Sequence, residues 1–231
     1  MSKFYGIGVG PGDKELLTLK AVRVLENIDL LIIPEAKKSN GSIAYEIAKD
    51  FINPRAEIIY MEFPMVNNTE IMYEVGKKAA RVVESYAADG KDIGFITLGD
   101  PSVYSTYSYI LKNLDSEVEV ETIPGITSFC ASAALLNKPL VTGEEILSII
   151  PATADEELIN RAIDVSGGQA FLKVFNHSEK LINILNEKGL IDNSVMVKRC
   201  GLEGCEVVHS IEEHLKKGKQ YLSIVISRKE Y

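Results

Sequence analysis

The sequence predicts an α/β protein with two α/β domains, the first built on a mostly parallel, doubly wound sheet and the second on a mixed sheet. Over residues 3–123, apolar runs typical of buried strands alternate with amphipathic stretches typical of helices, and this alternation builds parallel sheets. Nearer the C-terminal end, some strand-like runs are joined by links too short for a parallel crossover, so antiparallel pairs must enter the second sheet. With 231 residues, 46% of them hydrophobic, the chain can bury substantial cores.

In the first domain, residues 1–123, strand-like and helix-like segments follow one another. Strands are expected at 3–9, 29–34, 57–63, 92–98 and 118–123, and helices around 19–25, around 43–51, at 69–89 and from 104 to 114. Thr18 can cap the first helix, because its hydroxyl can accept an amide hydrogen bond, and Gly90 is expected to end the third. The last strand alternates charged and apolar residues, which indicates an edge or one wet face.

The second domain, residues 124–231, is expected to begin with a helix that runs to about Leu136. Strands are expected at 145–150, 170–174, 195–199, 206–209 and 221–227. The pattern Thr153–Glu156 fits a capping box that opens a helix to Ser166, and Ser178 is expected to cap the next helix, which Gly189 ends. Ser210–Glu213 fits a second capping box for a short helix.

Composition and charge exclude several classes of function. The net charge is −8 and no basic cluster indicates a nucleic-acid face. No apolar run approaches the ~20 residues of a membrane span, and the start has no signal-peptide pattern, so a cytoplasmic location is expected. The three cysteines are expected to be buried free thiols, with a Cys200–Cys205 redox or metal pair as the alternative. The three histidines form no constellation, and no metal site is expected.

Two glycine-rich turns follow strands and are candidate ligand loops. Gly99-Asp100-Pro101 ends a buried strand, because proline removes a ladder donor and glycine permits a sharp turn. The loop therefore lies at the carboxyl end of a central strand, where open α/β sheets bind ligands. Gly8–Asp13 does not fit the dinucleotide fingerprint in any register. It indicates either close backbone approach to a ligand or a tight strand-to-helix turn with no ligand.

The sequence carries no nucleophile-and-base signature, Walker loop or zinc motif. Loops suited to holding a ligand without an obvious nucleophile favour group transfer from a reactive cofactor, which the protein binds and orients.

Three motifs in this order resemble the tetrapyrrole (corrin and porphyrin) methylases over essentially the whole chain. They are Gly6–Asp13 followed by Leu16-Leu17-Thr18, then Gly99-Asp100-Pro101, then Pro124–Ser128. Within that family, the residues that follow Pro101, together with Phe171–Val174 and Lys198–Gly201, look most like the C-20 methyltransferases that act on precorrin-2 or cobalt-factor II in cobalamin biosynthesis.

The resemblance implies a homodimer that binds S-adenosylmethionine in the cleft between its two domains, and a tetrapyrrole substrate. It implies that Pro11 lies beneath the tetrapyrrole trough and that the donor site includes Gly99, Asp100, Val103, Ser105, Thr106, Ser128, Lys173 and Val174. For Val103 and Val174, an ordinary core role is the alternative.

The electron-rich meso carbon of such a substrate can attack the sulfonium methyl directly, so no protein nucleophile is required. A base must then remove the C-20 proton, and Asp100 and Tyr104 are the candidate catalytic residues, with a bound water or a substrate carboxylate as alternatives. Four cationic residues can pair with substrate carboxylates or can be solvated surface charges, namely Lys37, Lys38, Lys198 and Arg199.

Other functions stay open from the sequence. The chain can be another corrin-ring or uroporphyrinogen methylase, a diphthine synthase, or a non-catalytic protein that binds S-adenosylmethionine or a tetrapyrrole. The sequence does not distinguish metal-free precorrin-2 from cobalt-factor II as the substrate.

Overall fold

The computed structural model describes residues 2–36, 41–64, 66, 68–216 and 222–229. The chain divides into two compact units, Met1–Thr127 and Ser128–Tyr231. The sequence predicts the division slightly earlier, between residues 123 and 124. Each unit has a sheet of its own.

The first unit contains a five-stranded sheet in the order β3-β2-β4-β1-β5. Every neighbouring pair is parallel, which confirms the predicted parallel sheet. The strands are β1 (Lys3–Gly8), β2 (Leu30–Glu35), β3 (Glu57–Glu62), β4 (Ile93–Thr97) and β5 (Glu119–Ile123).

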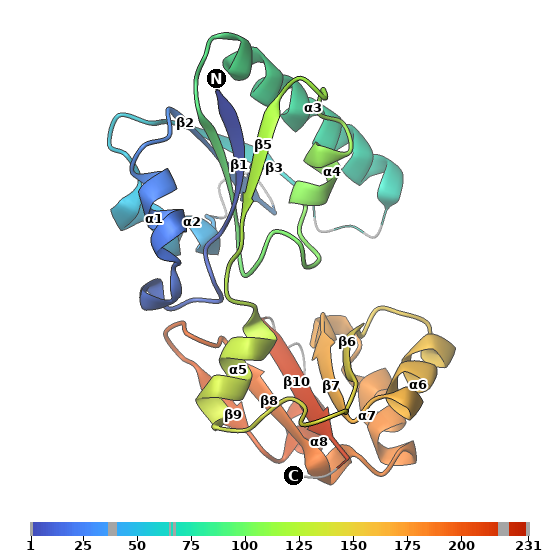
Figure 1. Ribbon diagram of the computed structural model, residues 1–231. Coiled ribbons are helices and arrows are strands. Elements are labelled where there is room, and N and C mark those ends of the chain that lie inside the picture. The colour runs from blue at the N-terminus through green and yellow to red at the C-terminus, as the bar shows by residue number, and fades with distance from the viewer. Residues whose placement is uncertain (1, 37–40, 65, 67, 217–221, 230–231) are drawn as a thin grey trace. The chain divides into compact units, whose positions relative to one another are not determined.

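Helices cover both faces of this sheet (Figure 1). One face packs on α1 (Leu19–Leu25) and α2 (Ile43–Ala48), and the other on α3 (Thr69–Ala88) and α4 (Tyr107–Leu111). Side chains of a strand alternate between faces, so Leu31 and Ile33 of β2 join the first core while Leu30 and Ile32 join the second. The doubly wound arrangement is thus built from nearly continuous apolar strands.

Local signals fix several helix ends of this unit. The Thr18 hydroxyl accepts a hydrogen bond from the amide of Ala21, 3.1 Å away, as predicted. Asn68 caps α3, and Gly90 follows its end with a φ of 76°. The fourth helix begins later than predicted, at Tyr107, because Tyr104 has a φ of 51°, which no right-handed helix contains.

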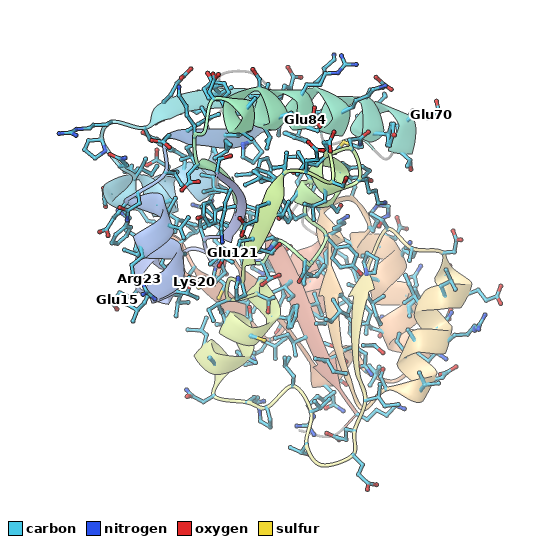
Figure 2. The ribbon with its side chains drawn as sticks, turned by 45° about the horizontal axis from the view of Figure 1, so that its top comes forward. Glu15, Lys20, Arg23, Glu70, Glu84 and Glu121 are labelled. Carbon is cyan, nitrogen blue, oxygen red and sulfur yellow. The ribbon has the colours of Figure 1, made fainter. Side chains whose placement is uncertain are left out.

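Strand β5 lies at an edge of the sheet, as its alternating pattern predicts. Lys3 lies 2.7 Å from Glu119, and Lys20 of α1 pairs with Glu121. Figure 2 shows Lys20 and Glu121 close to each other. These pairs are solvent-exposed, and charged side chains protect an edge strand from adding to another sheet.

The second unit contains a five-stranded sheet in the order β6-β7-β10-β8-β9. Strands β6 and β7 are parallel and the other pairs antiparallel, which confirms the predicted mixed sheet. The strands are β6 (Leu147–Pro151), β7 (Gly168–Leu172), β8 (Ser194–Lys198), β9 (Glu206–Val208) and β10 (Ser223–Arg228). The helices are α5 (Ser128–Leu136), α6 (Glu156–Val165), α7 (Ser178–Glu187) and α8 (Ile211–Lys216).

One core joins this sheet to α6, α7 and α8, with Phe171 and Leu185 fully buried in it. Helix α5 contacts β10 (Figure 1).

Two predicted helix caps of this unit are wrong. Asp155, not Thr153, precedes α6, and its side chain makes no capping bond. His177, not Ser178, precedes α7, because the Ser178 hydroxyl donates back to the Val174 carbonyl instead of accepting an amide.

The described ranges contain no helix with the length and apolar character needed to cross a bilayer. Cys130, Cys200 and Cys205 form no disulfide bond within these ranges, but only Cys200 is buried as expected, because the other two lie on exposed positions. No group of three acidic, histidine or cysteine side chains suited to a metal ion occurs in the part of the chain that the structure describes.

Candidate active site

The candidate site lies where β1 and β4 end. These strands are neighbours in the sheet, but β1 leads to α1 on one face and β4 to α4 on the other. Loops that leave neighbouring strands toward opposite faces open a crevice at the carboxyl end of a sheet, and open α/β proteins bind ligands there.

The loops after β1 and β4 are joined through their glycines. Gly99 donates to the Gly10 carbonyl at 2.8 Å, and Gly10 donates to the Gly99 carbonyl at 3.2 Å. Both residues have positive φ, 76° for Gly10 and 72° for Gly99, a region that glycine enters without steric cost. The two motifs therefore form one backbone unit.

The third motif touches the same point. A Cβ on Gly8 would lie 2.5 Å from the Gly125 nitrogen and 2.7 Å from the Gly99 oxygen, and a Cβ on Gly125 would collide with that oxygen. Three loops thus meet backbone to backbone, and a side chain at Gly8 or Gly125 would force them apart.

Asp100 ties these loops together. Its Oδ2 accepts from the Gly125 amide at 2.9 Å, and its Oδ1 accepts from the Ser102 amide at 2.8 Å and from the Ser102 hydroxyl. Burial raises the pKa of Asp100, but these hydrogen bonds outweigh it and hold the pKa below its ordinary value. The carboxylate is therefore ionised at neutral pH.

Hydroxyl groups organise the rest of the loop. The Ser105 hydroxyl donates to the Thr97 hydroxyl at 2.9 Å and accepts from the Tyr107 amide at 3.2 Å. The Tyr107 and Thr122 hydroxyls lie 2.9 Å apart, and Gly6 leaves the room that the Tyr107 ring occupies. The loop after β4 is consequently held at both its ends.

Tyr104 lies half exposed at 50% with left-handed backbone. Burial raises the pKa of its phenol, so the group is protonated at neutral pH and can donate a hydrogen bond but cannot act as a base there. Val103 and Thr106 are half-buried beside it, and Pro11 is buried in the loop after β1.

The structure gathers the predicted residues of the first unit in these loops. They are Pro11, Gly99, Asp100, Val103, Ser105 and Thr106. Ser128, Lys173 and Val174 belong to the second unit, where Ser128 begins α5 and Lys173 follows β7 with an exposed side chain and a φ of 59°. The Val174 side chain is 1% exposed and packs in the core, so only its backbone can face a ligand.

Sequence reasoning missed Thr97, Tyr107 and Thr122. The available signal was a threonine at the carboxyl end of β4 and another in β5, beside glycine-containing loops.

A hollow of about 270 Å³ between α1 and β5 contains none of the predicted site residues. Because its Lys20 and Glu121 are already paired, we place the site at the glycine loops.

The cationic candidates differ from one another. Lys198 lies 2.5 Å from Glu206, with His214 3.4 Å from its ammonium group, so its charge is already paired. Arg199 is exposed at the end of β8. Lys37 and Lys38 lie outside the described residues.

Known proteins resemble this chain along its whole length. The family model for tetrapyrrole (corrin/porphyrin) methylases matches residues 3–216. A probable cobalt-precorrin-2 C(20)-methyltransferase of Methanocaldococcus jannaschii is 40% identical over 99% of this chain and 97% of that protein. A cobalt-precorrin-2 C(20)-methyltransferase of Salmonella typhimurium is 29% identical with the same coverage.

Solved structures show the same fold. Uroporphyrin-III C-methyltransferase from Thermus thermophilus, complexed with S-adenosyl homocysteine, has a TM-score of 0.71 at 22% identity and covers 99% of this chain and 92% of its own. A diphthine synthase has a TM-score of 0.65 at 18% identity, covering 98% and 90%. Since the family model matches most of the chain and its three motifs meet at one point of the first sheet, the chain belongs to the tetrapyrrole (corrin/porphyrin) methylase family.

Proposed function

We propose that this protein is an S-adenosylmethionine-dependent methyltransferase that methylates C-20 of precorrin-2 or cobalt-factor II in cobalamin biosynthesis. The observation that carries the proposal is the similarity over 99% of the chain to two proteins named for that reaction. The glycine contact at the ends of β1 and β4 supports it, because it holds three loops together at the carboxyl ends of the strands, where α/β sheets bind ligands.

The loop after β4 leaves its backbone open to a donor at Gly99. Among the described residues beyond its chain neighbours, a Cβ on Gly99 would meet only the Ile126 carbonyl oxygen, at 4.0 Å, so a ligand can approach its backbone. S-Adenosylmethionine supplies an electrophilic methyl group when it is bound. We assign its contacts to Gly99, Asp100, Val103, Ser105 and Thr106, with Pro11 beneath the substrate and Ser128, Lys173 and Val174 contributing from the second unit.

The protein's part in the reaction is alignment and exclusion of water. A nucleophilic ring carbon needs no activation by a side chain, and correct orientation of two reactants can contribute about 7–11 kcal/mol to lowering the barrier. The rigid loop network around Asp100 and Ser105 suits this task, because groups that are already ordered lose little entropy on binding.

Of the two candidate bases, we propose Asp100 as the proton acceptor. It is ionised at neutral pH, whereas Tyr104 is protonated there because burial raises the pKa of its phenol. A low pKa makes Asp100 a weak base, which suffices for a proton on a carbon that has just gained a methyl group and a positive charge. The hydroxyl of Tyr104 remains a candidate donor to the substrate.

We further propose a cytoplasmic homodimer. The reduced thiols of Cys130, Cys200 and Cys205 suit a reducing compartment. Sedimentation should then give about twice the chain mass of 25.5 kDa, and a species of single-chain mass at micromolar concentration would contradict the dimer.

Incubation with precorrin-2 or cobalt-factor II and methyl-labelled S-adenosylmethionine tests the reaction. We expect a single labelled methyl group at C-20, and the faster of the two substrates identifies the metal state. Label at another carbon, label on uroporphyrinogen III, or label only on the acceptor of a diphthine synthase would each reject the proposal. Calorimetric binding of S-adenosylhomocysteine without turnover of any ring would favour a non-catalytic binding protein.

A further inference from the structure

Backbone strain is concentrated at one end of the strands of the second sheet, where β7 and β8 end and β10 begins. Lys173 has a φ of 59°, Arg199 of 49° and Leu222 of 56°, and among the described residues these are three of the five non-glycine residues with positive φ. They lie at the same end of the sheet, because Lys198 pairs with Ser223 and the Arg199 amide donates to the Leu222 carbonyl at 2.9 Å.

Left-handed backbone is unfavourable for residues that carry a Cβ. Such residues persist only where their surroundings hold them, and they collect at binding and catalytic sites. The backbone conformation alone therefore makes this end of the sheet a candidate binding site, before any charge is considered.

The side chain of Arg199 is also held in place. Its Nε donates to the Glu203 carbonyl at 2.8 Å, and a Cβ on Gly204 would lie 3.6 Å from that nitrogen, so the arginine lies along its own loop. Within the described ranges, the terminal guanidinium nitrogens have no protein partner. Neighbouring Lys198 differs, because Glu206 already neutralises it.

We propose that Arg199 is a substrate-binding residue, which holds a peripheral carboxylate of the macrocycle through its two terminal nitrogens. This inference rests on the proposed function and deepens it by assigning a substrate subsite. A planar guanidinium matches a carboxylate with two parallel hydrogen bonds. The fixed Nε leaves that fork ordered before the substrate arrives, which lowers the entropic cost of binding.

Binding of uroporphyrin III, a polycarboxylate macrocycle, measured by fluorescence quenching, tests the subsite without requiring turnover. For Arg199→Gly we expect the dissociation constant to rise about ten-fold or more, because a hydrogen bond to a charged group is lost. Arg199→Lys should restore part of the affinity, since it keeps the charge but not the fork.

Asn137→Gly is the matched control, because it relieves left-handed backbone of the same kind, with a φ of 52°, away from these strand ends and removes no charge. We expect it to leave macrocycle binding unchanged. Both glycine variants should have melting temperatures no lower than the parent, because glycine adopts their backbone without strain. Binding of S-adenosylhomocysteine should be unchanged in every variant.

Kinetics distinguish a lost substrate contact from a structural defect. In methyl transfer, Arg199→Gly should raise KM for the macrocycle while kcat stays within about two-fold, since uniform binding is lost. The inference is overturned if Arg199→Gly binds uroporphyrin III within about two-fold of the parent protein, or if the parent does not bind it. If the parent binds the macrocycle through Arg199 but transfers no methyl group to C-20, the proposed function fails and the subsite stands.

Discussion

Asp100 joins two loops of the candidate site through its two carboxylate oxygens. The same hydrogen bonds that order the loops also lower the pKa of this carboxyl group. Order in the loop and ionisation of its carboxylate are therefore one physical effect, and a change of charge at Asp100 should alter both.

Asp100→Asn should lower the free energy of unfolding at pH 7 by about 1–2 kcal/mol and weaken S-adenosylhomocysteine binding about ten-fold, because an amide cannot accept at both positions. A carboxyl whose folded pKa is depressed stabilises the protein above its unfolded pKa, near 3.9, and loses that contribution as pH falls through the folded value. The difference between the two proteins should therefore shrink as the pH falls below about 4.

Urea unfolding and calorimetry between pH 3 and pH 8 measure these effects. Asp155→Asn is the control, because the Asp155 side chain makes no capping hydrogen bond, and it should change neither quantity. A stability difference for Asp100→Asn that is constant over this range would contradict the proposed ionisation.

Gly8→Ala should destabilise the protein by about 3 kcal/mol and abolish S-adenosylhomocysteine binding, since its methyl group would meet backbone atoms that cannot move aside. Gly94→Ala is a matched control in the same sheet. Its Cβ would lie 3.0–3.2 Å from the ends of the Ile28, Leu31 and Ile7 side chains, which can shift, and should cost about 1 kcal/mol. Equal effects of the two substitutions, measured by urea unfolding, would show that backbone contact is not what limits this position.

The glycines and Asp100 could be predicted from the sequence, because a packed core has no need of a polar glycine-aspartate-proline turn directly after a buried strand. Thr97, Tyr107 and Thr122 could not. Their hydroxyl contacts depend on β1, β4 and β5 being neighbours, and a sequence does not reveal strand order.

Some helices of this molecule begin at a side chain that caps them, and others begin without one. Thr18 and Asn68 accept amide hydrogen bonds at the starts of α1 and α3, whereas Asp155 and His177 precede α6 and α7 without such a bond. The sequence located these helices but misplaced the caps of the last two, because several polar residues in succession can each fill the position and local pattern does not choose among them.

Asn68→Ala should lower the free energy of unfolding by about 1 kcal/mol, because two amides of α3 lose their acceptor. Asp155→Ala, where no side-chain cap exists, should cost less than about 0.5 kcal/mol. Chemical denaturation of both variants checks this, and a larger cost for the uncapped position would refute the assignment of caps.

The two units have separate hydrophobic cores. The core of the second unit draws on residues from Ile150 to Val225, and those of the first draw on residues from Phe4 to Ile123. The sequence predicted two domains because its strand and helix pattern changes character after β5, but the residue at which compactness divides depends on tertiary contacts.

Leu185→Ala should create a cavity in the second core, since Leu185 is fully buried, and cost that unit about 2–5 kcal/mol. Hydrogen exchange followed by mass spectrometry should show faster exchange in α6, α7 and β10 and little change in β1–β5. Uniform acceleration across both units would mean that the chain unfolds as one cooperative body.

The meeting of Gly8, Gly99 and Gly125 has a consequence for attempts to retarget this scaffold. A side chain at Gly8 or Gly125 would push the three loops apart, so substitutions that change the acceptor must be made at other positions. Libraries aimed at new acceptors should therefore keep these loops constant and vary the strand-end residues of the other sheet.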